Sequence, residues 1–197
     1  RWYAEHDELL ARDQLHGIEV VNEREYYPEA HAWCLEKNLT MLSNSDIHNP
    51  MGLDYGLHAN DRRPITLVFV RQRSVEGIRE ALFARRTAVF AADRLIGKPE
   101  FLRPIFERSI RVLTPSVRIR GTGSAYVQIQ NDSDIPFVFR PKLDHADLSF
   151  PEEIRLRPGR VALLQIRGRN KEAQGTHRIR LLGEVTNLWI RPDTPLA

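Results

Sequence analysis

The chain has 197 residues, of which 42% are hydrophobic and 28% are charged, and its formal net charge at pH 7 is +3. This composition is typical of one large or two small globular domains, and no apolar run approaches the roughly 18 residues that a membrane-spanning helix needs. The single cysteine, Cys34, excludes an intramolecular disulfide and a zinc site built from several cysteines.

The charged residues divide the chain into two unlike parts. Residues 1–104 hold 14 lysines and arginines against 16 acidic residues, whereas residues 105–197 hold 15 against 10. The basic residues of the second part alternate with apolar ones, as in Arg118-Ile119-Arg120, which is typical of the outward face of strands. A nucleic-acid site would cluster arginines among aromatic residues. We therefore expect no nucleic acid among the partners.

The first predicted elements are a helix over residues 2–15, ended by Gly17, and a strand over residues 18–22. An apolar strand of an α/β fold is buried on both faces, where an unpaired charge is costly. Glu19 therefore lies either at the strand's edge or in a functional site, and the sequence leaves both alternatives open. Asn22 ends this strand and is a candidate for substrate binding.

A second helix is predicted over residues 28–37, because Pro28 fits the first turn of a helix. Ala30 and Cys34 recur at helical spacing and should face inward. His31 lies near the start of this helix, and we expect it at the surface or as a capping residue.

The apolar run at residues 39–42 predicts a buried strand that ends in the sequence Ser45-Asp46-Ile47-His48. In a strand, residues i and i+2 point to the same face, so Asp46 and His48 can address one metal ion or one substrate atom together. A carboxylate and an imidazole suit Zn, Mn or Fe better than Ca or Mg. The alternative is an Asp that caps the next turn beside a His that only packs against it.

Residues 49–63 form a predicted loop that is long enough to be functional. His58 lies within it and is either a substrate contact or a solvated loop histidine.

Beyond this loop the pattern predicts a strand over residues 65–70, a helix that Ser74 caps and that runs to residue 84, and a strand over residues 85–90. Together with the earlier elements, this alternation of strands and helices favours an α/β layer fold or a β/α barrel. Four apolar residues of the helix that Ser74 caps recur at helical spacing and should face inward: Val75, Ile78, Ala81 and Leu82.

The second part of the chain shows no helical period from about residue 109. Short strand-like runs between turn signals predict a small antiparallel β-sandwich. Its histidines, His145 and His177, have no partner pattern, and we expect structural roles for them. The predicted strands are residues 110–119, 125–130, 137–140, 153–156, 161–166, 176–182 and 187–190.

The first 100 residues resemble the C-terminal part of a PHP (polymerase and histidinol phosphatase) domain. The matching segments are residues 17–22 (GIEVVN), residues 45–48 (SDIH) and residues 77–82 (GIREAL) followed by Arg86-Thr87. The β-rich second part is similar to the immunoglobulin-like domain that some bacterial members carry. The resemblance implies a division into residues 1–104, the C-terminal part of a distorted β/α barrel, and residues 105–197, an all-β immunoglobulin-like sandwich.

The resemblance also implies a metal-dependent phosphoesterase that holds two or three divalent ions and hydrolyses a small phosphorylated substrate. It assigns metal-ligand roles to Asp46 and His48, and it leaves Asn22, His58 and Arg86 as candidate substrate contacts. Arg86 can instead anchor the end of a strand. The family's His-x-His motif and its ligands on the middle strands have no counterpart here, so we expect them upstream of Arg1.

Because the sequence opens on Arg1 rather than Met, we expect a longer parent protein, whose compartment the sequence leaves open between the cytoplasm and an exported location. On this reading the parent is an enzyme, and this chain alone is inactive without the upstream half of its own barrel. The alternative is a non-catalytic interaction module, in which the β-sandwich docks a partner and the Asp-x-His motif is vestigial.

Overall fold

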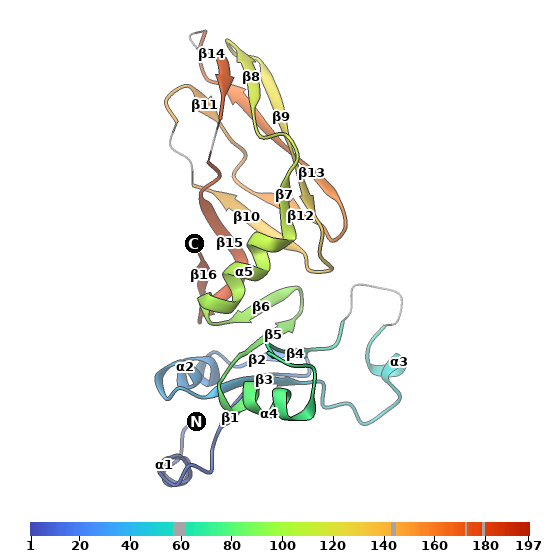
Figure 1. The fold of residues 1–197 in the computed structure, drawn as a ribbon, viewed down its shortest axis with the longest axis vertical. Helices are drawn as coiled ribbons and strands as arrows, with labels where there is room; N and C mark the ends of the chain where they lie inside the picture. The colour runs from blue at the N-terminus through green and yellow to red at the C-terminus, as the bar shows by residue number, and fades with distance from the viewer. Residues whose placement is uncertain (57–61, 143–144, 172, 179) are drawn as a thin grey trace. The chain divides into compact units, whose positions relative to one another are not determined.

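The computed structural model describes residues 1–56, 62–142, 145–171, 173–178 and 180–197. The chain divides into two compact units (Figure 1). The first comprises Arg1–Leu102 and Trp189–Thr194, and the second comprises Arg103–Leu188 and Pro195–Ala197. Within the described residues, no helix is both long and apolar enough to cross a membrane. His58, the candidate in the predicted loop, lies outside the described residues.

A parallel pair of strands forms one part of the first unit. β1 (Gly17–Asn22) and β3 (Thr40–Asn44) lie side by side and are joined through α2 (Pro28–Glu36), while the short β2 (Glu25–Tyr26) pairs antiparallel with β1. α2 begins at Pro28 as predicted, because a proline lacks only a backbone N–H that has no partner in the first turn. β1 and β3 approach closely: a Cβ on Gly17 would lie 2.9 Å from the carbonyl oxygen of Thr40.

Three antiparallel strands form the other part of the first unit: β4 (Ile65–Val68), β5 (Thr87–Ala91) and β6 (Arg94–Gly97). Between β4 and β5 lies α4 (Val75–Phe83), whose N-cap Ser74 accepts a hydrogen bond from the backbone N–H of Gly77, as predicted. The sequence did not predict β6. The unit is thus a mixed helix and strand structure with both parallel and antiparallel pairs.

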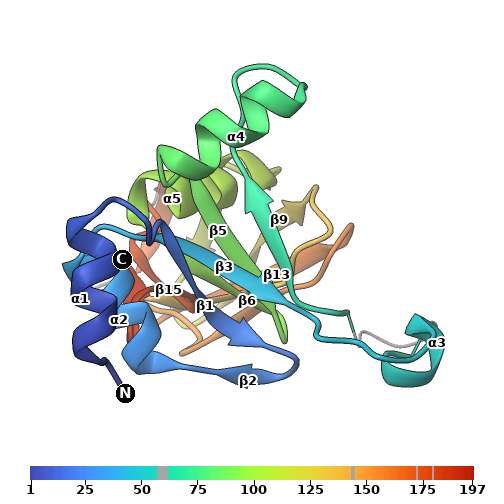
Figure 2. The same cartoon turned by 90° about the horizontal axis from the view of Figure 1, so that it is seen from below.

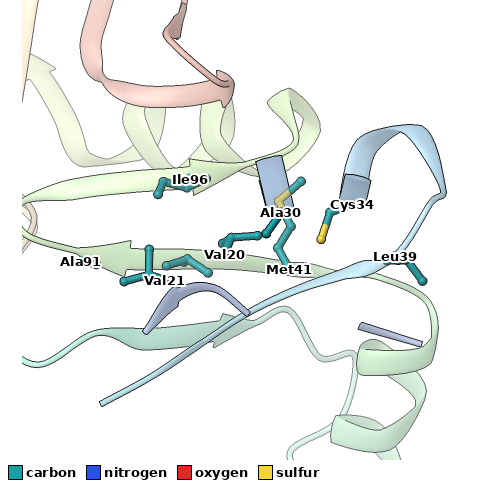
Figure 3. Close-up of a cluster of buried hydrophobic side chains, with 9 residues drawn as sticks. Val20, Val21, Ala30, Cys34, Leu39, Met41, Ala91 and Ile96 are labelled. Carbon is teal, nitrogen blue, oxygen red and sulfur yellow. The ribbon is translucent and has the colours of Figure 1, made fainter. Parts of the chain in front are cut away.

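The core of this unit gathers side chains from β1, α2, β3, β5 and β6 (Figure 3). Cys34 is fully buried within it, and burial raises the pKa of its thiol to about 12, so this cysteine is a packing residue. The cluster comprises Val20, Val21, Ala30, Cys34, Leu39, Met41, Val89, Ala91 and Ile96.

Two helices differ from their predictions. α1 (Ala4–Ala11) ends well before Gly17, which belongs to β1, because the chain turns at Asp13 with a positive φ of 56°. In α4 only Ala81 is buried, whereas Val75 and Ile78 are 77% and 46% exposed. The prediction that Val75 and Ile78 face inward was wrong, because a helical period identifies an apolar face but not whether anything covers it.

The second unit consists mainly of short antiparallel strands. α5 (Pro99–Ser109), which the sequence did not predict, leads into it. Strands β11, β13, β9 and β7 form one sheet, β14 pairs with β8, and β10 pairs with β12 and β15. The strands from here to the end of the chain are β7 (Ile110–Val112), β8 (Val117–Arg120), β9 (Ser124–Asn131), β10 (Phe137–Pro141), β11 (Leu148–Ser149), β12 (Ile154–Leu156), β13 (Val161–Gly168), β14 (Gln174–His177), β15 (Gly183–Arg191) and β16 (Thr194–Leu196).

Candidate functional site

The C-terminal ends of β1 and β3 meet at one edge of the first unit. Asn22 lies opposite Asn44 in the parallel register, and the backbone N–H of Glu23 donates to the carbonyl of Asn44 at 3.0 Å. In sheets of parallel strands, ligands commonly bind outside the carboxyl ends of the strands. The segments that leave this edge, beginning at Glu23 and Ser45, are therefore the first place to look for a site.

Glu19 is paired with two amides at this edge. Asn22 Nδ2 donates to Glu19 Oε2 at 2.8 Å, and Asn44 Nδ2 donates to Glu19 Oε1. The register of β1 against β3 shifts between Glu19 and Val21, and this extra residue lets side chains three positions apart share a face. The charge of Glu19 is thereby satisfied within the β1–β3 pair. Asn22 takes part in this network, and its role as a substrate contact stays a prediction.

Asp46 and His48 come together just beyond β3. Asp46 Oδ1 lies 3.5 Å from His48 Nε2, and the two side chains are 51% and 82% exposed. The strand geometry predicted for this pair was wrong, because β3 ends at Asn44 and Asp46 adopts a positive φ of 46°. Aspartate tolerates this left-handed conformation better than most residues. The contact is therefore made by a turn and not by strand alternation, and it leaves open the alternative in which His48 only lies against Asp46.

The Asp46–His48 pair lines a pocket of about 410 Å³. One wall comes from α3 (Met51–Asp54), a short helix within the predicted loop, on a segment that extends away from the strands in both views (Figures 1 and 2). Arg24 Nη2 donates to the carbonyl of Asp54 at 3.0 Å, and its guanidinium lies 5.3 Å from the ring centroid of Tyr55. Arg24 thus connects the turn after β1 with α3. The lining residues are Glu23, Arg24, Ser45, Asp46, Ile47, His48, Asn49, Leu53, Asp54 and Tyr55.

The pocket lining is acidic. Three carboxylates, those of Glu23, Asp46 and Asp54, face one guanidinium, that of Arg24. A surface lined mainly by one sign of charge concentrates ions of the opposite sign, so this pocket favours a cation. Within the part of the chain that the structure describes, no group of three or more His, Cys, Asp or Glu residues is arranged to hold a metal. Asp46 and His48 therefore supply two donors, and a complete site needs further ligands.

Arg86 forms an ion pair away from this pocket. Its Nη1 donates to Glu80 Oε1 at 2.7 Å, its Nη2 donates to Glu80 Oε2, and its Nε donates to the carbonyl of Phe69 at 3.0 Å. The hydrogen bond from Arg86 lowers the pKa of Glu80. These contacts fasten the start of β5 to α4, which is the anchoring role left open by the sequence. A role in substrate binding stays a prediction.

The surface or capping role predicted for His31 was wrong. The side chain is fully buried, its Nδ1 lies 2.9 Å from the Tyr26 hydroxyl, and burial lowers its pKa to about 4. His31 therefore stays neutral at physiological pH, although the helix start suggested a surface or capping role. The available signal was its spacing, because His31 lies next to Ala30 and three residues before Cys34 on the buried face of α2.

The chain is similar to known proteins in two respects. Residues 110–197 match a family model described as an Ig-like domain. The whole chain is similar, with 34% identity and a TM-score of 0.84, to the crystal structure of a two-domain protein from Bacteroides vulgatus that contains a predicted PHP-like metal-dependent phosphoesterase. The match covers 100% of this chain but 55% of that one, so the chain spans about half the length of its structural neighbour. No curated protein matches the chain. The chain thus combines an Ig-like second part with a relation to a PHP-containing protein.

Proposed function

We propose that this chain forms part of a metal-dependent phosphoesterase, in which Asp46 and His48 bind a divalent cation beside the C-terminal ends of β1 and β3. The main support for this proposal is the contact between Asp46 Oδ1 and His48 Nε2 in an exposed, acidic pocket. The likeness to a protein with a predicted PHP-like metal-dependent phosphoesterase supports the same assignment.

The two donors fit one metal ion. Zn–N and Zn–O bonds in tetrahedral sites place neighbouring donors about 3.4 Å apart. The observed separation of Asp46 Oδ1 and His48 Nε2 is 3.5 Å, so both can bind one ion with little movement. A carboxylate with an imidazole suits Zn, Mn or Fe. The exposure of both side chains leaves room for ligands from elsewhere.

A pair of such ions would lower the pKa of a bound water and stabilise the charge that develops on a phosphate ester during its hydrolysis. In this chain Asp46 supplies negative charge to hold a cation, and His48 must be neutral to donate its Nε2 lone pair. Asn22 lies at the same edge and is the better placed of the candidate substrate contacts. Arg86 would have to leave Glu80 to reach a phosphate, and His58 lies outside the described residues.

We also propose that the two parts of this chain belong to different domains of a longer protein. Residues 1–104 would complete a β/α barrel with an upstream half that carries the missing ligands, and residues 105–197 would form the appended sandwich. Two donors cannot hold the two or three ions of a phosphoesterase of this type. We therefore expect the 197-residue chain alone to release no p-nitrophenol from p-nitrophenyl phosphate in the presence of Mn²⁺. Measurable turnover by the purified chain would refute this incompleteness.

Metal binding by the chain can be tested without activity. During a titration with Mn²⁺, we expect paramagnetic broadening of the backbone amide signals of residues 45–49 before those of other segments. A matched control exists in the same unit, because His16 Nδ1 lies 3.6 Å from Asp13 Oδ1. Asp46→Asn should abolish the selective broadening, and Asp13→Asn should leave it unchanged. Equal broadening around both pairs would reduce the Asp46–His48 pair to an ordinary surface contact.

A further inference from the structure

The second unit carries a groove of about 690 Å³, lined by residues of β12, of the turn after it and of the first part of β13. This volume lies in the range of ligand sites in proteins. Its walls are formed by Pro151, Glu153, Ile154, Arg155, Arg157, Arg160, Val161, Ala162, Leu163 and Gln165.

Two sheet edges meet in this groove. β12 pairs with β10 on one side. β13 pairs with β9 over residues 161–167, but on its other side it pairs with β11 only at Arg167 and Gly168. Among the described residues, no strand therefore pairs with the outer edge of β12 or with this edge of residues 161–166. An unpaired edge presents backbone N–H and C=O groups that can accept an added strand.

The groove is basic. Arg155 lies in β12, Arg157 directly follows that strand, and Arg160 immediately precedes β13. Arg155 Nε lies 3.2 Å from Glu153 Oε1, whereas Arg157 and Arg160 make no ion pair within the described part of the chain. All three arginines are exposed, so their guanidinium groups are accessible to an anionic ligand.

The rest of the lining is mostly aliphatic. Leu163 and Val161 are 60% and 47% exposed on the β13 side, and Ile154 lies on the β12 side. No aromatic side chain is among the described lining residues. Sequence-independent binding of single-stranded nucleic acid relies on aromatic stacking platforms, so the lining disfavours that class of ligand.

We propose that this groove binds an extended acidic segment of a partner protein, which adds as a strand to the open edge of β13. The side chains of an extended segment alternate with a period of two, so every second residue would face the β12 wall. Carboxylates at those positions match the two-residue spacing of Arg155 and Arg157, and the intervening residues cover Val161 and Leu163. This inference is independent of the metal site of the first unit.

The direct probe is an end-blocked octapeptide of alternating threonine and glutamate. Its dissociation constant for the 197-residue chain is measured by isothermal titration calorimetry, beside a peptide with glutamine in place of glutamate. We expect the glutamine peptide to bind at least about 10-fold more weakly, since it loses two or more exposed ion pairs. A third peptide, N-methylated at alternate residues, keeps every carboxylate but cannot pair as a strand, and it should also lose binding.

A matched pair of charge reversals locates the site. Arg155→Glu with Arg157→Glu should abolish binding of the glutamate peptide and create binding of a lysine peptide. Arg118→Glu with Arg120→Glu makes the same charge change at two exposed strand residues outside the groove lining, and it should leave the dissociation constant unchanged. Circular dichroism of both variants verifies that they fold.

Three results would overturn the proposal. They are equal losses in both double variants, undiminished binding of the N-methylated peptide, and no binding of the glutamate peptide at millimolar concentration. Equal binding of the sulfated polysaccharide heparin by both double variants would show that net charge alone attracts polyanions to this unit, and it would also count against a specific groove.

Discussion

The pocket beside β3 and the groove beside β12 are both exposed, and both are built where strands end or lack a neighbour. Their charges are opposite: three carboxylates against one guanidinium in the pocket, and three guanidiniums against one carboxylate in the groove. The pocket offers side-chain donors on turns that leave the ends of parallel strands. The groove offers the open edges of antiparallel strands.

This difference follows from the two kinds of sheet. In a parallel pair, the strand ends lie at one edge and the segments that leave them can converge on a small ligand. In a sandwich of antiparallel strands, unpaired edges run along the strands and suit an extended ligand. With the opposite charges of the two linings, we propose a cation for the first unit and an acidic segment for the second. If each ligand binds its own unit, a change confined to one unit should leave binding in the other unchanged.

The largest effect is expected from Leu164→Ala in the core of the second unit. Leu164 is fully buried on β13, and removing its side chain should lower the free energy of unfolding of that unit by roughly 2–5 kcal/mol. Chemical denaturation followed by NMR measures this loss. We expect weaker binding of the acidic peptide and unchanged Mn²⁺ broadening at residues 45–49. Loss of the broadening would show that the pocket of the first unit depends on the folding of the second unit.

A pH effect of comparable size is expected in the first unit. Burial depresses the pKa of His31 from 6.5 to about 4, so the unfolded state binds a proton between these values and the folded state does not. The stabilising contribution is present above about pH 6.5 and is lost as the pH falls towards 4, a change of roughly 3 kcal/mol.

His31→Gln removes this titration while keeping a polar group near Tyr26. Urea unfolding of the first unit between pH 7 and pH 4 should therefore have a flatter pH dependence in the variant than in the natural chain. An unchanged slope would show that other groups of the unit cause the acid sensitivity.

The smallest effect is expected from Arg86→Lys. A lysine cannot make the bidentate contact with Glu80 while also donating to the Phe69 carbonyl. The free energy of unfolding of the first unit should therefore fall. Because Arg86 does not line the pocket, the dissociation constant for Mn²⁺ should change by less than about twofold. Inorganic phosphate then discriminates the two roles of Arg86. Phosphate is added while hydrogen exchange of the backbone amides around residue 86 is followed. If phosphate slows this exchange in the natural chain but not in the variant, Arg86 binds phosphate and its anchoring role is secondary.

The sequence predicted those elements that carry their own local signals. Pro28 at the start of α2 and Ser74 at the cap of α4 fix helix starts through backbone hydrogen bonding, which depends on nearby residues alone. β6 was missed because its hairpin turns at Ala92-Asp93, both with positive φ, in place of a glycine-containing pair. α5 was missed because Pro104 lies inside it, where proline removes a helical hydrogen bond.

The sequence singled out Asp46 and His48, but not the other residues that line the pocket or the geometry that brings the pair together. The close approach of Asp46 and His48 was predicted from their spacing, yet it depends on a left-handed residue that no periodicity reveals. The partners of Glu19 were not predictable, since Asn44 reaches it only through the pairing of β1 with β3. The burial of His31 depends on how α2 packs, and its spacing from Cys34 was the local signal for it.

On the proposed function, Asp46 and His48 bind one divalent cation together. The most direct measurement is a crystal structure of the 197-residue chain soaked in Zn²⁺, with an anomalous difference map recorded at the zinc edge. We predict one peak within about 2.2 Å of both Asp46 Oδ1 and His48 Nε2. A map without density at this pair, or with an equal peak between Asp13 and His16, would contradict the assignment.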